Sequence, residues 1–257
     1  MPEAGLIELA SGGELTLQAT VSAREITLVG PATFEACPGG DEAVRLSRGK
    51  VTAFPGVGVR SGAEVWVATP LGVVRFGDAK IEMAIADRDA TRLEIAVIGG
   101  HATWVPAAGV VAHAAPAGAL GDGSDASVDA GSEVIALGPG TTLEANRRGG
   151  AIATWVRDLV AACGREADAA REAARRVRSP PEGARASLGD LAFAHVAARQ
   201  RARAACETAR AAAALGPGQL DAGVRAAIER ADAIWKSGLP SPPASSGVPA
   251  PSAPTAD

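Results

Sequence analysis

The segment Val65–Ile85, VWVATPLGVVRFGDAKIEMAI, decides the fold, because apolar residues alternate along it on both sides of the turn Thr69-Pro70-Leu71-Gly72. Alternation with a period of two is typical of half-buried strands. Gly72 and the pair Gly77-Asp78 mark bends, since glycine tolerates unusual φ and Asp can hydrogen-bond its own backbone. The residues predicted to face the core are Val65, Val67, Leu71, Val73, Ile81, Met83 and Ile85, with Arg75 as a further candidate. We therefore predict three strands joined by two turns, with recognition rather than catalysis as their role.

The same period continues on both sides of this segment. Short alternating runs recur about every ten residues from Leu15 to Ala53 and again over Thr91–Val105, and they are separated by Gly and Pro. This spacing is typical of an all-β sandwich, barrel or solenoid. Nothing in residues 1–110 has helical periodicity. From Pro106 to Ala130 small residues and Gly dominate, which favours a loop in which only Val110-Val111 pair briefly.

Two segments repeat within the β region. Glu25–Ala36, EITLVGPATFEA, matches Glu133–Ala145, EVIALGPGTTLEA, with one residue inserted, and Gly49–Pro55, GKVTAFP, is echoed by Gly100–Pro106, GHATWVP. Internal repeats are typical of arrays in which each unit covers the apolar face of its neighbour. We therefore expect similar strand-turn units, stacked side by side.

The period changes to helical after Gly149-Gly150. Helices are predicted over about Ala151–Val177, Ser187–Leu215 and Leu220–Trp235, with Pro-rich or Gly-rich connections between them. Such helices pack as a small antiparallel bundle or lie on the β domain. The final segment, Gly238–Asp257, is rich in Pro, Ser and Ala and is predicted to be a disordered tail. The chain is thus divided into an all-β domain (1–150), an α-helical region (151–237) and the tail (238–257).

The composition excludes strong electrostatic partners. Residues 1–150 carry 11 Lys and Arg against 18 Asp and Glu, and residues 151–257 carry 14 against 11, so that the net charge is −4. Binding of nucleic acid or an anionic membrane requires a concentrated basic face, so neither partner is expected. The Arg-rich runs Arg171–Arg178 and Arg199–Arg203 are interpreted as solvated helix faces, in which Arg171 and Arg175 pair with Glu166 and Glu172.

The three cysteines, Cys37, Cys163 and Cys206, are without CxxC or His spacing for zinc. Cys163 and Cys206 lie in helical segments and would form a disulfide if those helices pair, but we favour small buried thiols. There is no apolar run long enough for a membrane span and no signal-peptide pattern. The chain works in the cytoplasm, or it begins after a removed signal or anchor.

No catalytic or metal-binding constellation is visible in the sequence. His101, His113 and His195 have no ligand at metal spacing, the G-x-S-x-G elbow of α/β hydrolases is missing, and the glycines form no phosphate loop. Trp66 and Trp104 lie in strands, where they fill a core or line a binding groove. We therefore expect no enzyme activity, cofactor or metal.

Several of these segments together resemble the FecR-domain family, the periplasmic domain of the ferric citrate regulator. The resemblance rests on Thr69-Pro70-Leu71-Gly72, Gly77, Ile81-Glu82-Met83, Leu93-Glu94-Ile95, Gly99-Gly100, the preceding Ala43–Val51 and the closing Val134–Gly140. It covers roughly residues 12 to 146 and departs where the family has Gly-Thr, here Gly77-Asp78, and Glu-Gly, here Gly99-Gly100. Thr69, Pro70, Gly72, Gly77, Gly99 and Gly100 are the family-motif positions, with a structural or partner-binding role.

The resemblance implies an all-β, non-enzymatic domain of the periplasm or cell envelope that binds a protein partner. Our first hypothesis is an envelope binding or scaffold module, in which the helices mediate assembly. The second is a sensor or regulatory subunit in sigma-factor signalling, and the third is an enzyme with an unrecognised site. Cytoplasmic location is the alternative to the envelope.

Overall fold

The structure of the protein is a computed structural model, which describes residues 6–18, 25–36, 43–54, 64–85, 89–116, 127–129, 134–149, 151–179, 188–215 and 222–237. The predicted tail Gly238–Asp257 lies outside the described residues. The strands are β1 (Leu6–Leu9), β2 (Glu14–Gln18), β3 (Glu25–Ala36), β4 (Ala43–Phe54), β5 (Val65–Thr69), β6 (Gly72–Phe76), β7 (Lys80–Ile85), β8 (Arg92–Gly99), β9 (Ala102–Pro106), β10 (Val110–Pro116), β11 (Ser127–Asp129), β12 (Ile135–Leu137) and β13 (Thr141–Arg147). The helices are α1 (Ile152–Arg178), α2 (Leu188–Ala213) and α3 (Ala222–Lys236).

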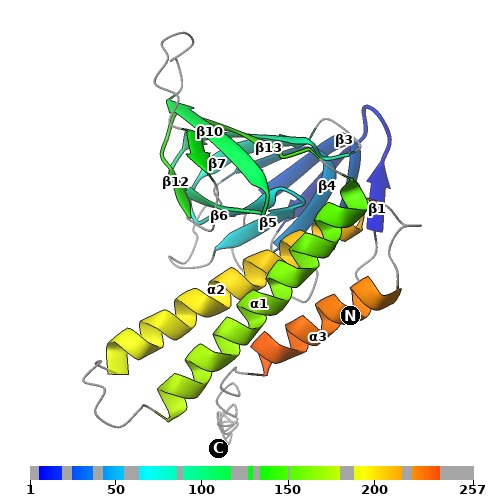
Figure 1. Ribbon diagram of the computed structural model, residues 1–257. Coiled ribbons are helices and arrows are strands. Elements are labelled where there is room, and N and C mark those ends of the chain that lie inside the picture. The colour runs from blue at the N-terminus through cyan, green and yellow to red at the C-terminus, as the bar shows by residue number, and fades with distance from the viewer. Residues whose placement is uncertain are drawn as a thin grey trace, which may run out of the picture.

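A curled sheet precedes three helices, as the sequence predicts (Figure 1). The sheet forks at β4. The first part of β4 pairs in parallel with β5, whereas residues 49–53 pair antiparallel with β7. One branch runs through β7, β8, β13, β10 and β11, and the other runs through β5, β6, β9 and β12. β3 lies along β4 and pairs in turn with β1 and β2.

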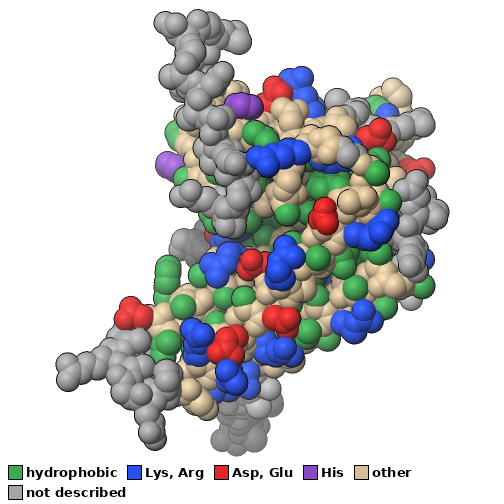
Figure 2. Space-filling model, in the orientation of Figure 1, with side chains coloured by type: hydrophobic (Ala, Val, Ile, Leu, Met, Phe, Trp, Pro, Cys, Tyr) green, Lys and Arg blue, Asp and Glu red, His purple; other side chains and the backbone are tan. Residues whose placement is uncertain are grey.

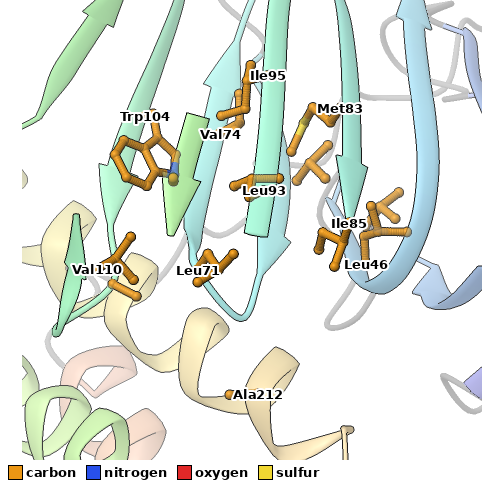
Figure 3. Packing of buried hydrophobic residues seen from close by; sticks show 14 of the residues in the cluster. Leu46, Leu71, Val74, Met83, Ile85, Leu93, Ile95, Trp104, Val110 and Ala212 are labelled. Carbon is orange, nitrogen blue, oxygen red and sulfur yellow. The ribbon is translucent and has the colours of Figure 1, made fainter. Parts of the chain in front are cut away.

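The two branches face each other across a single apolar core. Leu71, Val74 and Trp104 lie on one branch, and Met83, Ile85, Leu93 and Ile95 lie on the other (Figure 3). Trp104 is fully buried, so of the two roles open to it the core role is correct. The strands thus form one curled sheet, a half-barrel around this core, and not a solenoid of stacked units.

The prediction for the core face of β6 is wrong. Val67 pairs with Val74 and Val65 with Phe76, and residues directly opposite in a sheet share a face. Val74 and Phe76 therefore point into the core, whereas Val73 lies on the outer face with Trp66 and Ala68. That face is also buried, because α2 covers it, and alternation alone could not reveal a strand buried on both sides.

The stacked-repeat hypothesis is also wrong. Glu25–Ala36 forms the single strand β3, but the described part of its repeat forms β12 and β13, which pair with β9 and with β8 and β10. The two copies differ at the third residue of their Gly-Pro turn, which is Ala32 in the first and Gly140 in the second. Gly140 has φ +76°, a left-handed conformation that glycine adopts freely and that the corresponding Ala32 would adopt only at a cost. The second copy therefore reverses direction at its Gly-Pro-Gly turn.

Residues 107–116 do not form the predicted loop, whereas residues 117–126 and 130 of that prediction lie outside the described residues. Val110–Pro116 forms β10, which pairs with β13 along its whole length. Val110 and Ala112 are buried on the core side. The alternation of alanine with other residues is a weak signal for a strand, because alanine is common on both faces of a strand.

The three helices begin and end close to their predicted positions. α1 and α2 lie side by side beneath the sheet and continue past its edge, with α3 packed on them (Figure 1). α2 contacts β4, β5 and β6, where Ala204 packs on Trp66, Ala68 and Val73. The guanidinium groups of Arg75 and Arg203 lie 4.8 and 4.1 Å from the centre of the Trp66 ring. Trp66 therefore fills the sheet–helix interface.

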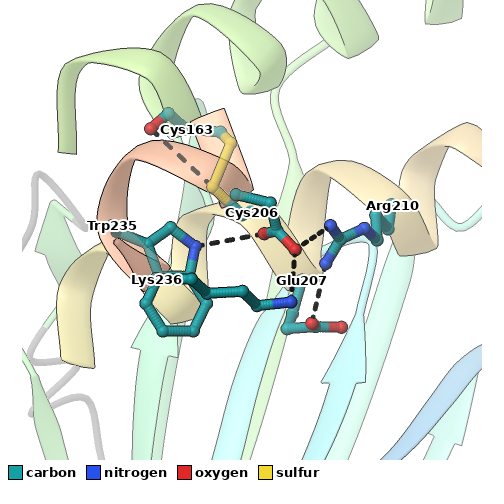
Figure 4. The surroundings of a disulfide bond; sticks show 7 residues. Cys163, Cys206, Glu207, Arg210, Trp235 and Lys236 are labelled. Carbon is teal, nitrogen blue, oxygen red and sulfur yellow. Dashed lines mark hydrogen bonds and ion pairs between the residues drawn. A yellow bond between two sulfur atoms is a disulfide. The ribbon is translucent and has the colours of Figure 1, made fainter. Parts of the chain in front are cut away.

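Cys163 and Cys206 form a disulfide between α1 and α2 (Figure 4), so the expectation of free buried thiols is wrong. The two helices pair antiparallel, which places both sulfur atoms in the same buried layer. Side chains at this position are small on both helices, and a close helix crossing brings the two Cα atoms to 4.6 Å.

A series of ion pairs connects β3 to α3 through β4 and α2. Arg45 on β4 contacts Glu35 and Glu207, both at 2.5 Å. Arg210 then links Glu207 to Asp232 on α3, which also accepts hydrogen bonds from Lys236 and the Trp235 indole (Figure 4). Burial by itself raises the pKa of Asp232, but the bonds from Arg210 and Lys236 outweigh it, so its pKa lies below the usual value.

Replacing both cysteines with serine will lower the free energy of unfolding. The disulfide closes a loop of 43 residues, and chain entropy for such a loop corresponds to about 4 kcal/mol. Urea unfolding of the oxidised protein and of the Cys163→Ser/Cys206→Ser variant will measure the loss, with Cys163→Ser alone as the partner control. Equal midpoints for all three proteins would show that the bond is not formed in solution.

Asp232→Asn will lower stability at neutral pH by roughly 1–3 kcal/mol, because three donors lose their charged acceptor. The pKa of Asp232 is depressed in the folded state, so its contribution is complete above the ordinary value near 3.8 and is lost as the pH falls through the lower folded pKa. Unfolding in urea at pH 7 and at successive values below 4 should thus show a smaller acid loss for the variant. An unchanged acid profile would contradict this.

Candidate functional site

The family-motif residues fall at two opposite ends of the β5–β6 hairpin. At one end Thr69 and Pro70 are buried in the turn, where the Thr69 hydroxyl donates to the Gly72 carbonyl at 2.8 Å. The carbonyl of Leu71 accepts a hydrogen bond from the Ala107 amide at 3.0 Å. The turn therefore fixes the position of the β9–β10 turn beside it.

The close approach of β9 to this turn requires glycine at position 72. It has φ +145°, and a Cβ atom placed there would lie 2.4 Å from the Val105 carbonyl oxygen and 2.6 Å from the Trp104 indole nitrogen. Gly77, Gly99 and Gly100 lie at the other end, where only Gly100 is similarly crowded, against Ala79 and Asp78. The structure thus does not bring the six motif residues into one site.

A groove of about 380 Å³ opens between the β9–β10 turn and the two long helices. Its lining is mostly apolar, with Pro106, Ala107 and Ala108 on the turn and Leu159 and Ala205 on α1 and α2. The turn is held by the Leu71 contact and by the Trp155 indole, which donates to the Ala108 carbonyl at 3.1 Å. The groove is therefore framed by fixed backbone.

Charged side chains stand on the helix side of this groove. Figure 2 shows a hollow beneath the sheet with an apolar floor and with basic and acidic groups beside it. Arg201 pairs with Glu166 at 3.4 Å, whereas Arg165 makes no ion pair or hydrogen bond with the part of the chain that the structure describes. The groove therefore carries one uncompensated positive charge.

A second candidate surface is the helical arm, which we define as residues 168–178 of α1 and 188–200 of α2. Phe193 is 77% exposed and Val196 is 50% exposed. They lie one to two turns before Gln200, which accepts a hydrogen bond from Arg75, and two to three turns before Ala204, which packs on the sheet. Positions three, four and seven apart share a helix face. The face of α2 that packs on the sheet therefore continues along the helical arm as an apolar stripe, which no described residue covers.

The helical arm is also basic, with five arginines against three acidic residues. Arg171 pairs with Asp168, and Arg175 and Arg176 pair with Glu172, so the interpretation of solvated pairs is confirmed for this helix except that Glu166 pairs with Arg201 instead. Burial first, and then the charges of Arg199 and Arg178, lower the pKa of His195. Arg199 and Arg178 thus add a positive field to the effect of burial at His195, which precedes Val196 in the sequence.

Sequence reasoning did not single out the groove or the apolar pair. The groove is lined by alanine, proline and backbone, which carry no motif. The signal for the pair was present, because Phe193 and Val196 follow the same spacing as Gln200 and Ala204, but only the position of the sheet shows where the stripe loses its cover. Among the described residues, no group of three or more His, Cys, Asp or Glu is placed to hold a metal, and no helix is long and apolar enough to cross a membrane.

Comparison with known proteins gives a distant structural likeness. No family model matches the chain, and no curated protein matches it. Two crystal structures of a candidate anti-sigma factor from Parabacteroides distasonis ATCC 8503 are similar to it, each with 13% sequence identity and a TM-score of 0.40. The chain spans 57% of the length of those structures, with 57% of its own residues aligned.

Gly72→Ala will destabilise the protein by roughly 1–3 kcal/mol, because its Cβ meets backbone and a buried indole at a φ that alanine rarely adopts. Gly77→Ala is the matched control, since nothing lies within 4 Å of its Cβ, and it should stay within about 0.5 kcal/mol of the parent. Urea unfolding followed by Trp fluorescence measures both. Similar losses in the two variants would contradict the packing described for the Thr69–Gly72 turn.

Proposed function

We propose that this chain is a non-enzymatic protein-binding module of the bacterial cell envelope, and that it works as a regulatory subunit in sigma-factor signalling. The observation that carries the proposal is the apolar stripe on the helical arm, which no described residue covers. A 77% exposed Phe193 is costly to leave in water, and an apolar pair rimmed by charge is typical of a protein-binding surface. The partner is a protein with an apolar contact surface and acidic groups around it.

The disulfide supports a location in the cell envelope. Cys163 and Cys206 are bonded across α1 and α2, and such bonds persist in oxidising surroundings such as the periplasm and are rare in the cytosol. The buried position of the bond, between two helices, suits a structural rather than a transient role. The disulfide therefore supports a location outside the cytoplasm.

The regulatory role is supported by the FecR resemblance of the β domain. Its most specific element, Thr69-Pro70-Leu71-Gly72, is the buried turn that positions the β9–β10 connection, so the motif serves the fold that carries the helices. A scaffold that holds envelope proteins together is the second candidate, and it is favoured by the same exposed stripe. The two differ in whether transcription changes when the protein is lost.

Phe193→Asp will abolish partner binding and leave the fold intact. The side chain is exposed, so the free energy of unfolding should change by no more than about 0.5 kcal/mol. Ile98→Asp is the matched control, because Ile98 is 50% exposed on β8 and lies away from the arm. Both variants are expressed in the native host in place of the parent protein, with envelope fractionation and RNA sequencing as readouts.

The expected result is that the Phe193→Asp strain shows the transcriptional change of the deletion strain and that the Ile98→Asp strain does not. A photo-crosslinking residue at position 193, but not at position 98, should also yield one adduct in the envelope fraction. An adduct without a transcriptional response would favour the scaffold. Protein found wholly in the cytosol, or no adduct at position 193, would refute the proposal.

A further inference from the structure

The groove beside the β9–β10 turn has the geometry of a small-molecule site. Its volume of about 380 Å³ falls in the range of about 300–1,000 Å³ that is common for ligand pockets. One wall is the turn Pro106–Gly109, and the other is formed by α1 and α2 close to their crosslink at Cys163 and Cys206. Both walls are fixed before any ligand arrives, so little ordering is needed on binding.

The polar groups of the groove are few. Thr208 lines it with a side chain that is 3% exposed, and neither its hydroxyl nor Arg165 has a hydrogen-bond partner in the described residues. Arg201 is already paired with Glu166. An apolar lining with one free guanidinium and one free hydroxyl matches a ligand that has an apolar body and a single anionic head.

We propose that this groove binds a small amphipathic carboxylate, with the apolar body against Pro106, Leu159 and Ala205 and the carboxylate on Arg165. The single net positive charge selects a monoanion over a dianion. A phosphate or a sulfate would have no apolar part to fill the groove. This site is independent of the helical arm, so the inference goes beyond the protein-binding function.

The test uses octanoate as the probe and the full chain, with affinity measured by titration calorimetry. Octanoate should bind at sub-millimolar concentration, and 1-octanol should bind at least about tenfold more weakly, because it has no charge for Arg165. The indole N–H signal of Trp155 should shift on binding, since this group holds the Ala108 carbonyl in the groove wall. The signal of Trp235, which is bonded to Asp232, should not shift.

Three variants decide the outcome. Arg165→Met should weaken octanoate at least about tenfold, while Arg171→Met, on the exposed face of the same helix, should have no effect. Glu166→Gln should tighten octanoate several-fold, because it releases Arg201 and removes a negative charge from the rim. Equal affinity for octanoate and octanol, equal affinity in the Arg165→Met variant, or no binding at millimolar octanoate would each overturn the proposal. None of these results depends on the crosslinking at position 193.

Discussion

The contact between α2 and the outer face of β5 and β6 is the interaction on which the rest of the structure depends. Trp66, Ala68 and Val73 would otherwise be an apolar patch on the surface, and Ala204 covers them. The guanidinium groups of Arg75 and Arg203 make cation–π contacts with the Trp66 ring, and each well-placed contact of this kind stabilises the fold by about 0.5–2 kcal/mol. The Arg45–Glu207 ion pair adds a second contact between the sheet and α2, about one turn beyond Ala204.

This contact also explains why the helical arm and the groove exist. α2 has 26 residues and is about 39 Å long at 1.5 Å per residue, which exceeds the width of the three strands that it crosses. The part beyond the sheet is the arm, with its uncovered Phe193. The groove lies where α1, held to α2 by the disulfide, meets the β9–β10 turn at the end of the sheet.

Much of the fold could be predicted from the sequence, because the strands and helices carry strong periods and clear breaks. The errors arose where one feature of the chain depends on a distant one. The face of Val73 was misassigned since α2 buries the outer side of the hairpin, and the repeated segment was misread since Gly140 permits a reversal that Ala32 does not. The cysteine bond required the pairing of two helices to be known. The groove could not be predicted at all, because alanine and backbone carry no chemical signature.

The disulfide gives the two long helices a pivot. Phe193 lies 13 residues before Cys206, which corresponds to about 20 Å along the helix axis. A rotation of α2 by about 5° about the crosslink would therefore displace the end of that lever by about 1.7 Å, which exceeds the tolerance of a packed interface. Ala205 and Thr208 of the groove flank the pivot itself, where the same rotation produces almost no displacement. Small changes of shape beside Cys206 are thus amplified mechanically at the exposed side chains of Phe193 and Val196.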